Sequence, residues 1–95
     1  MTVTVLALVK AIKGNEAKVK ENLISQVAPT RLEEGCINYD LHQSSTDPTE
    51  FMFYENWTSR ETLKAHSESA HILVSRERNK GLLERPTEIT LWDSI

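Results

Sequence analysis

The first strand-like segment, residues 2–12, constrains the fold more than any other part of the chain. Its sequence, TVTVLALVKAI, is rich in branched aliphatic residues and has no chain-breaking residue before Gly14, which predicts a β-strand. Odd-numbered positions carry valine and alanine, and even-numbered positions include Leu6, Leu8 and Ile12. Because both faces of this strand are apolar, we expect helices to cover one side and a second subunit to cover the other.

The rest of the sequence alternates between helical and strand patterns. Residues 16–28 carry apolar side chains at helical spacing, Pro29 kinks or stops this helix, and a short helical continuation closes at Gly35. Further elements are predicted as strands over 36–44 and 50–57, helices over 60–66 and from about 70 to 83, and a final strand over 87–93. The order β-α-β-β-α-β predicts a ferredoxin-like α+β fold, with a four-stranded antiparallel sheet and helices on one face.

Length and charge limit the classes of function. The chain has 95 residues, which predicts a single domain over residues 1–95 with a modest core and favours self-association. Its 11 basic and 14 acidic residues give a net charge of −3 without a basic stripe, which argues against binding to nucleic acid or to an anionic membrane. The sequence has one cysteine and shows no phosphate loop or metal-ligand spacing. We also expect no leader and no membrane-spanning helix, because the first residues lack a basic region and their apolar run ends at Lys10. We therefore expect a cytoplasmic protein without a disulfide or a metal site.

Residues 50–71 concentrate the side chains suited to binding and acid–base chemistry. Four of the six aromatic residues and two of the three histidines lie here: Phe51, Phe53, Tyr54, Trp57, His66 and His71. The two histidines are five residues apart and would not share a face of a continuous helix, but a break at 67–69 lets them do so. Histidine is the side chain most easily used as an acid or base near neutral pH. The alternative is that each histidine ends or begins a short helix and is partly exposed.

The strand over residues 50–57 poses a choice between its two faces. Phe53, Glu55 and Trp57 point to one side and Tyr54 to the other, so Phe53 and Tyr54 cannot both line one pocket. Glu55 either orients a histidine or binds a substrate hydroxyl, or else it pairs with a charge on a neighbouring helix or subunit. Trp57 belongs either to a pocket wall or to the core.

The strand over residues 36–44 alternates between apolar and polar residues. Its apolar face is predicted to carry Ile37, Tyr39 and Leu41, and its polar face to carry Cys36, Asn38, Asp40 and His42. Tyr39, like Tyr54, is either a hydroxyl donor to a ligand or a half-buried strand residue. Asn38 binds a phenolic or carbonyl oxygen if its face turns toward a pocket, and it is satisfied by a second subunit if that face is an interface. Cys36 has no cation nearby in the sequence to lower the pKa of its thiol, which argues against a nucleophile.

Three motifs together resemble a known family. They are Glu-Gly-Cys-x-x-Tyr at 34–39, Phe-x-x-Tyr-Glu-x-Trp at 51–57, and Leu63-x-x-His66 followed by His71. Their order and spacing are similar to those of the antibiotic biosynthesis monooxygenase family, small proteins of the dimeric α+β barrel superfamily. The resemblance covers nearly the whole chain. It implies a ferredoxin-like protomer whose sheet packs face to face with that of a second copy, forming a homodimer.

The resemblance also implies an activity and a set of site residues. Characterised members include cofactor-independent oxygenases, which need neither metal nor flavin because a deprotonated, electron-rich phenol or quinol itself reduces molecular oxygen. The protein binds a flat ring, assists deprotonation and excludes water. On this basis the candidate catalytic residues are His66 as the base, with Asn38 and Glu55. The candidate substrate-binding residues are Phe53, Tyr54, Trp57, Tyr39 and His71.

Two other functions compete with this interpretation. The family resemblance extends to isomerases that process autoinducer-2 and act on phosphorylated, sugar-derived ketones, so an isomerase or tautomerase of a small carbonyl compound is the first alternative. A non-catalytic, dimeric ligand-binding module is the second. Haem-degrading relatives carry an asparagine on the first strand and a histidine in the last helix. The first strand here has no asparagine, and Arg76 lies near the position of that histidine, which argues against haem degradation.

Overall fold

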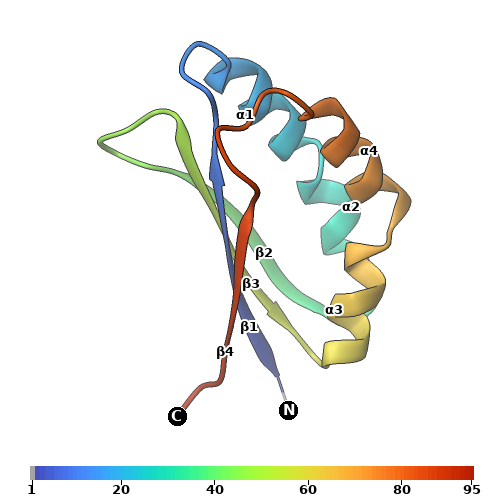
Figure 1. Cartoon of the computed structure of the whole chain (residues 1–95). Helices are drawn as coiled ribbons and strands as arrows, with labels where there is room; N and C mark the ends of the chain where they lie inside the picture. Colours follow the sequence, from blue (N-terminus) through green and yellow to red (C-terminus); the bar gives the residue numbers. More distant parts are fainter. Residues whose placement is uncertain (1) are drawn as a thin grey trace.

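The computed structural model describes residues 2–95 and has the predicted ferredoxin-like α+β fold. Its elements in chain order are β1 (Val3–Lys10), α1 (Glu16–Ile24), α2 (Val27–Arg31), β2 (Cys36–Gln43), β3 (Glu50–Trp57), α3 (Arg60–Ser67), α4 (Ala70–Arg78) and β4 (Glu88–Trp92). The strands form one sheet in the order β2-β3-β1-β4, and all neighbouring pairs are antiparallel. All the helices lie on one side of this sheet, and the two termini lie close together at one end (Figure 1).

The core lies between the sheet and the helices. Strand β1 occupies a central position, with β3 on one side and β4 on the other. The alternation expected from the sequence is present, because the odd-numbered residues of β1 and β3 are buried against the helices. This core comprises Val3, Val5, Ala7, Val9, Ala11, Val19, Leu23, Tyr39, Phe51, Phe53 and Trp57.

The first and the last helix are shorter than the sequence pattern predicts. The first helix ends at Ile24, and Pro29 lies in the first turn of α2, where backbone N–H groups have no acceptor within the helix and a proline is therefore tolerated. The expectation that the last helix runs to about Leu83 is wrong, because α4 ends at Arg78. Gly81 lies in the turn that follows the helix, where the Leu82 N–H bonds the Asn79 carbonyl, and its φ of 78° is a left-handed conformation that glycine accepts without steric cost.

One strand face was misassigned from sequence. A β-bulge between Cys36 and Asn38 interrupts the pairing of β2 with β3, and a bulge shifts the side-chain alternation by one residue. As a result Cys36 packs against the core, whereas Ile37 is 54% exposed. Beyond the bulge, Tyr39 is buried and Leu41 packs against the core, as predicted.

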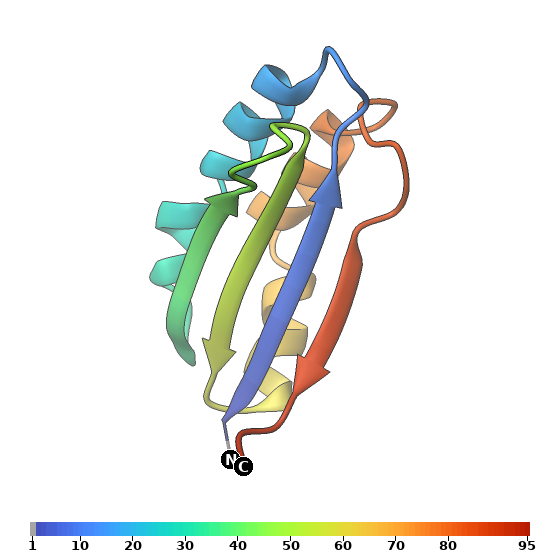
Figure 2. The ribbon, with the colours of Figure 1, turned by 90° about the vertical axis from the view of Figure 1, so that its left-hand side faces the viewer.

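The sheet face opposite the helices is uncovered in the single chain. Figure 2 views this face, with the helices behind it. Its exposed large side chains include Leu8 (42%), Tyr54 (41%) and Trp92 (54%). These residues occupy neighbouring strands, and Leu6 pairs with Tyr54 across them. The second apolar face of β1 is therefore open to solvent, as is expected if another subunit covers it.

Strand β4 is also incompletely covered on its helix side. Ile89 and Leu91 pair with Ala7 and Val5, so they share the face that packs on the helices, yet both are exposed. This strip of the sheet leaves room for a cavity. None of the helices in residues 2–95 is long and apolar enough to cross a bilayer.

Candidate functional site

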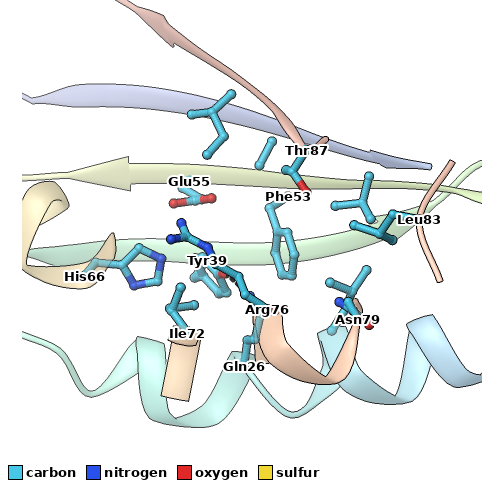
Figure 3. Close-up of a pocket in the computed structure, with 14 residues that line it drawn as sticks. Gln26, Tyr39, Phe53, Glu55, His66, Ile72, Arg76, Asn79, Leu83 and Thr87 are labelled. Atoms are coloured by element: carbon cyan, nitrogen blue, oxygen red, sulfur yellow. Dashed lines mark hydrogen bonds between the residues drawn. The ribbon is translucent and has the colours of Figure 1, made fainter. Parts of the chain in front are cut away.

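A cavity of about 350 Å³ lies between the sheet and helices α1 and α4. Its size falls in the range of pockets that bind small organic ligands. Its wall combines apolar side chains with several polar ones, and Figure 3 shows both kinds directed into the same space. The lining residues are Ala7, Val9, Leu23, Gln26, Tyr39, Phe53, Glu55, His66, Ile72, Arg76, Asn79, Leu83, Thr87 and Ile89.

A second cavity of about 450 Å³ adjoins the first along α3. The two share Glu55, His66, Arg76 and Ile89. The shared residues include one imidazole, one carboxyl group and one guanidinium. A ligand in either cavity therefore meets the same three ionisable side chains.

His66 is fixed by the end of helix α3 and by its aromatic neighbours. The helix begins with a capping box in which Ser59 and Thr62 bond each other's backbone N–H groups, an arrangement that fixes a helix start. The imidazole is buried, and its centroid lies 4.7 Å from that of Trp57 and 5.3 Å from that of Tyr39. Burial lowers the pKa of His66, although its bond to Glu33 opposes that change. The ring is therefore neutral at neutral pH.

The protonation of the His66 ring follows from its partner. Nδ1 lies 3.1 and 3.2 Å from the two carboxylate oxygens of Glu33. An ionised carboxylate only accepts hydrogen bonds, so Nδ1 carries the proton and Nε2 keeps its lone pair. Among residues 2–95 no hydrogen bond occupies Nε2, and the ring nitrogen farther from the chain points into the cavity (Figure 3). This geometry is that of a histidine base oriented by a carboxylate.

Glu33 also holds the second histidine. His71 Nε2 lies 2.6 Å from Glu33 Oε1 and 3.0 Å from Thr30 Oγ1. The two imidazole centroids are 6.1 Å apart, so the break between α3 and α4 brings His66 and His71 together, which is one of the two arrangements that the sequence left open. His71 lines neither cavity, and it contacts the site through Glu33.

A close backbone approach brings Glu33 to His66. Gly35 has a φ of 84°, and any side chain there would clash with Thr62 of α3. The turn that carries Glu33 therefore packs directly against the helix that carries His66. The sequence analysis assigned Glu33 no role, because no local signal indicates that it meets a residue more than 30 positions later.

Glu55 is a buried carboxyl group in the shared wall. It is 4% exposed and accepts a hydrogen bond of 2.9 Å from Trp57 Nε1. Burial raises the pKa of Glu55 to about 7, the Trp57 bond lowers it, and the charge of Glu33 raises it further. Within residues 2–95 it forms no ion pair. Near neutral pH this group can therefore donate or accept a proton in the cavity.

Two of the aromatic candidates line the cavity, and a third lies behind its wall. Tyr39 and Phe53 line the cavity, and their rings stack at a centroid distance of 4.6 Å. The Tyr39 hydroxyl accepts a hydrogen bond of 2.9 Å from Gln26 Nε2, and burial raises the pKa of Tyr39. Trp57 is fully buried and lines neither cavity, so it supports Glu55 from the core.

Asn38 and Tyr54 lie on the other face of the sheet. Asn38 Nδ2 donates to Asp40 Oδ2 at 3.0 Å and to the Tyr54 carbonyl at 3.1 Å, and Asn38 Oδ1 accepts from Asn56 at 2.8 Å. Both residues lie outside the cavity, since the alternation of β3 turns Phe53 and Glu55 toward the helices and Tyr54 away. Within one chain, therefore, Phe53 lines the cavity and Tyr54 does not.

Arg76 lines the cavity, although the sequence analysis assigned it no role in binding. It is exposed on α4, yet its side chain extends into the first cavity, and it is the only cation among the residues that line it (Figure 3). Gln26 and Asn79 were also missed. They are buried polar groups with partners in α4 and α1: Ser75 Oγ donates to Gln26 Oε1, and Asn22 donates to Asn79 Oδ1.

Comparison with known proteins identifies the family to which the sequence is similar. The family model described as antibiotic biosynthesis monooxygenase matches residues 2–78. “Putative monooxygenase Rv0793” of Mycobacterium tuberculosis is 39% identical over 69 residues, which cover 73% of this chain and 67% of that protein. “Putative monooxygenase YcnE” of Bacillus subtilis is 32% identical over 65 residues, covering 68% of each. The match to sll1783 of Synechocystis, named as uncharacterized, covers 45% of that protein.

Solved structures with the same fold cover the whole chain. The structure of Rv0793 superposes with a TM-score of 0.92 at 30% identity, covering 100% of this chain and 96% of that one. The structure of PA3566 from Pseudomonas aeruginosa gives a TM-score of 0.94 at 31% identity, covering 99% and 94%.

Proposed function

Because the chain belongs to the antibiotic biosynthesis monooxygenase family, we propose that it is a cofactor-independent monooxygenase acting on a small aromatic substrate of phenol or quinol type. The observation that carries this proposal is the His66 imidazole in the cavity wall. Its Nδ1 is held by Glu33, and its Nε2 is available as a base. The homologues named as monooxygenases support an oxidative reaction.

The cavity suits a flat ring with an ionisable hydroxyl. Phe53 and the stacked Tyr39 offer an apolar wall, and about 350 Å³ accommodates a small ring system. Arg76 is the cation that stabilises a phenolate in this space, because opposite charges attract more strongly in a partly buried site than in water. Glu55, half protonated near its pKa of about 7, hydrogen-bonds a second oxygen of the ring.

The chemistry begins with proton transfer. His66 Nε2 accepts the phenolic proton, and Glu33 stabilises the resulting imidazolium. The electron-rich anion then reduces oxygen directly. For a quinol, one oxygen atom enters the ring and the other leaves as water, while the substrate loses four electrons and becomes a hydroxyquinone. His66 returns its proton to the oxygen that leaves as water, which restores the base.

Dimerisation would stabilise the sheet that forms one wall of the cavity. We propose that two copies associate through the uncovered sheet face. Leu8, Tyr54 and Trp92 are exposed there together, and a contiguous apolar patch on a small protein is typical of an interface. Asn38 and Tyr54 would then belong to the interface and support β3 from behind.

A second candidate is a tautomerase or isomerase of a small carbonyl compound. The observation that favours it is the presence of two acid–base groups, His66 and Glu55, on the same cavity wall. One removes a proton beside the carbonyl and the other donates one, without oxygen.

Oxygen dependence separates these functions. Metal-stripped protein should consume oxygen with a panel of hydroquinones and anthrone-like phenols, and turnover should stop under anaerobic conditions. Turnover that continues without oxygen would favour the isomerase. If the protein binds a ring compound but converts it neither with oxygen nor without it, the result would favour a non-catalytic ligand-binding module.

A further inference from the structure

We propose that Glu33, His66 and His71 form a binding site for a divalent transition metal such as Zn²⁺, and that metal bound there switches off the base of the proposed reaction. The binding part stands on geometry alone, whereas the inhibition part rests on the proposed function. The sequence shows no metal spacing, because the three residues come from separate segments: the turn after α2, the end of α3 and the start of α4.

The three ligand atoms already lie near the positions that a metal requires. One atom from each residue lies within 4.8 Å of the others. Glu33 is 3.1 Å from His66 Nδ1 and 2.6 Å from His71 Nε2. Ligand atoms around a tetrahedral Zn²⁺ are about 3.3 Å apart, because its bonds to nitrogen and oxygen are about 2.0–2.1 Å. Side-chain adjustments therefore suffice to admit the ion, without movement of the helices.

The donor set suits borderline metals. Two imidazole nitrogens and one carboxylate oxygen are ligands that Zn²⁺ prefers and that leave one position for water. Ca²⁺ and Mg²⁺ prefer all-oxygen sites and are excluded by the two imidazoles. The carboxylate of Glu33 and one of the histidines are partly open to solvent, with side chains 18% and 24% exposed, so the ion has an entry path.

Metal binding inverts the tautomer of His66. At present Nδ1–H donates to Glu33 and Nε2 is the free acceptor. A metal takes the Nδ1 lone pair, so the proton of the neutral ring moves to Nε2. His66 then presents an N–H donor to the cavity instead of a base. No oxidation or group transfer is involved, and the metal-bound protein keeps its pocket but loses its proton acceptor.

The test titrates metal-stripped protein with Zn²⁺ and with Co²⁺ in the absence of substrate. We expect one ion per chain, a raised thermal midpoint and the visible absorption of a low-coordinate Co²⁺ site. The His71→Ala and Glu33→Gln variants should weaken binding by about tenfold or more. The matched control is His42→Ala, which removes the third histidine, exposed on β2, and it should bind as the wild type does. Equal binding by all variants, or no binding, would overturn the proposal.

Two further measurements test metal binding and inhibition separately in the wild-type protein. In ¹⁵N-histidine-labelled wild-type protein, Zn²⁺ should shift the ring signals of two histidines and leave the third unchanged, which requires no variant to fold. In the oxygen-uptake assay, Zn²⁺ should inhibit the wild type and a chelator should restore the rate. If Zn²⁺ binds but does not inhibit, the metal site stands and only the proposed inhibition through His66 is overturned. If the metal-free protein consumes no oxygen, only the proposed function is contradicted.

Discussion

The Glu33 carboxylate lies 3.1 Å from His66 Nδ1, and this contact determines which nitrogen of the imidazole faces the cavity. The two residues are 33 positions apart in the sequence and meet because Gly35 lets the turn pack on Thr62. The same carboxylate holds His71. One partly buried acid therefore orients the candidate base and links it to a histidine that is also partly exposed.

Replacing Glu33 with glutamine should slow turnover while leaving substrate affinity nearly unchanged. The amide cannot stabilise an imidazolium as a carboxylate does, so kcat should fall by roughly tenfold or more. Stability should fall by about 1–3 kcal/mol, because hydrogen bonds to a charged group are lost. The neighbouring Glu34 is exposed, so Glu34→Gln is the control. Steady-state kinetics and denaturation measure both effects, and equal kcat values for the two variants would argue against an orienting role.

Glu55 should make the stability depend on pH. Its folded pKa of about 7 lies above the ordinary glutamate value of 4.5, so protonation favours the folded state. The contribution of Glu55 to the free energy of unfolding is roughly 3 kcal/mol. It is fully present below the pKa of Glu55 in the unfolded chain, and it is lost as the pH rises through the pKa of Glu55 in the folded protein. Glu55→Gln should therefore gain stability relative to the wild type between about pH 5 and pH 8.

Denaturation with urea at several pH values measures this difference. Glu33, His66 and Arg76 act on the same region and are present in both proteins, so the comparison isolates the replacement of the Glu55 carboxyl group. Glu84→Gln alters an exposed carboxyl group and serves as the control. A stability difference that does not change with pH would mean that Glu55 is not a perturbed acid.

Arg76 should contribute to substrate binding. Removing the cation with Arg76→Gln should raise KM for a phenolic substrate by roughly tenfold, because a charge pair in a partly buried site is worth on the order of 1–2 kcal/mol. Arg78 is exposed on the same helix and lines neither cavity, so Arg78→Gln should leave KM unchanged. Parallel changes in both variants would indicate a general effect of net charge instead.

The uncovered sheet face should hold two copies together. Light scattering of the wild type at micromolar concentration should give twice the chain mass. Leu8→Glu should yield monomers, because it introduces a charge into the apolar patch. Leu73→Glu alters a leucine of similar exposure, 52% against 42%, on the helical side and should remain dimeric. A monomeric wild type would contradict the proposed interface.

The sequence was sufficient for the fold but not for the assembly of the site. Alternation in β1 and β3 is strong and local, and it indicated which residues share a face. The bulge at Ile37 and the early end of α4 depend on backbone geometry at single residues, which periodicity does not reveal. Alternation also could not say which face of β3 meets the helices, so Tyr54 and Phe53 remained competing wall residues.

Long-range contacts explain the residues that were missed. Glu33 and Arg76 carry no motif of their own, and they join His66 only through the packing of the turn after α2 and of α4 against α3. The proximity of His66 and His71 was one of two alternatives that the sequence allowed, because both residues flank one short helix break. Their shared carboxylate was not predictable, because it lies more than 30 residues earlier in the chain.

The most direct measurement is the rate of oxygen consumption by His66→Gln with a quinol that the wild type oxidises. Glutamine keeps the polarity of the site but cannot accept the proton, so kcat should fall by about 100-fold or more. His42→Gln, which alters the exposed histidine of β2, should match the wild type. Retention of wild-type turnover by His66→Gln would contradict the assignment of His66 as the base.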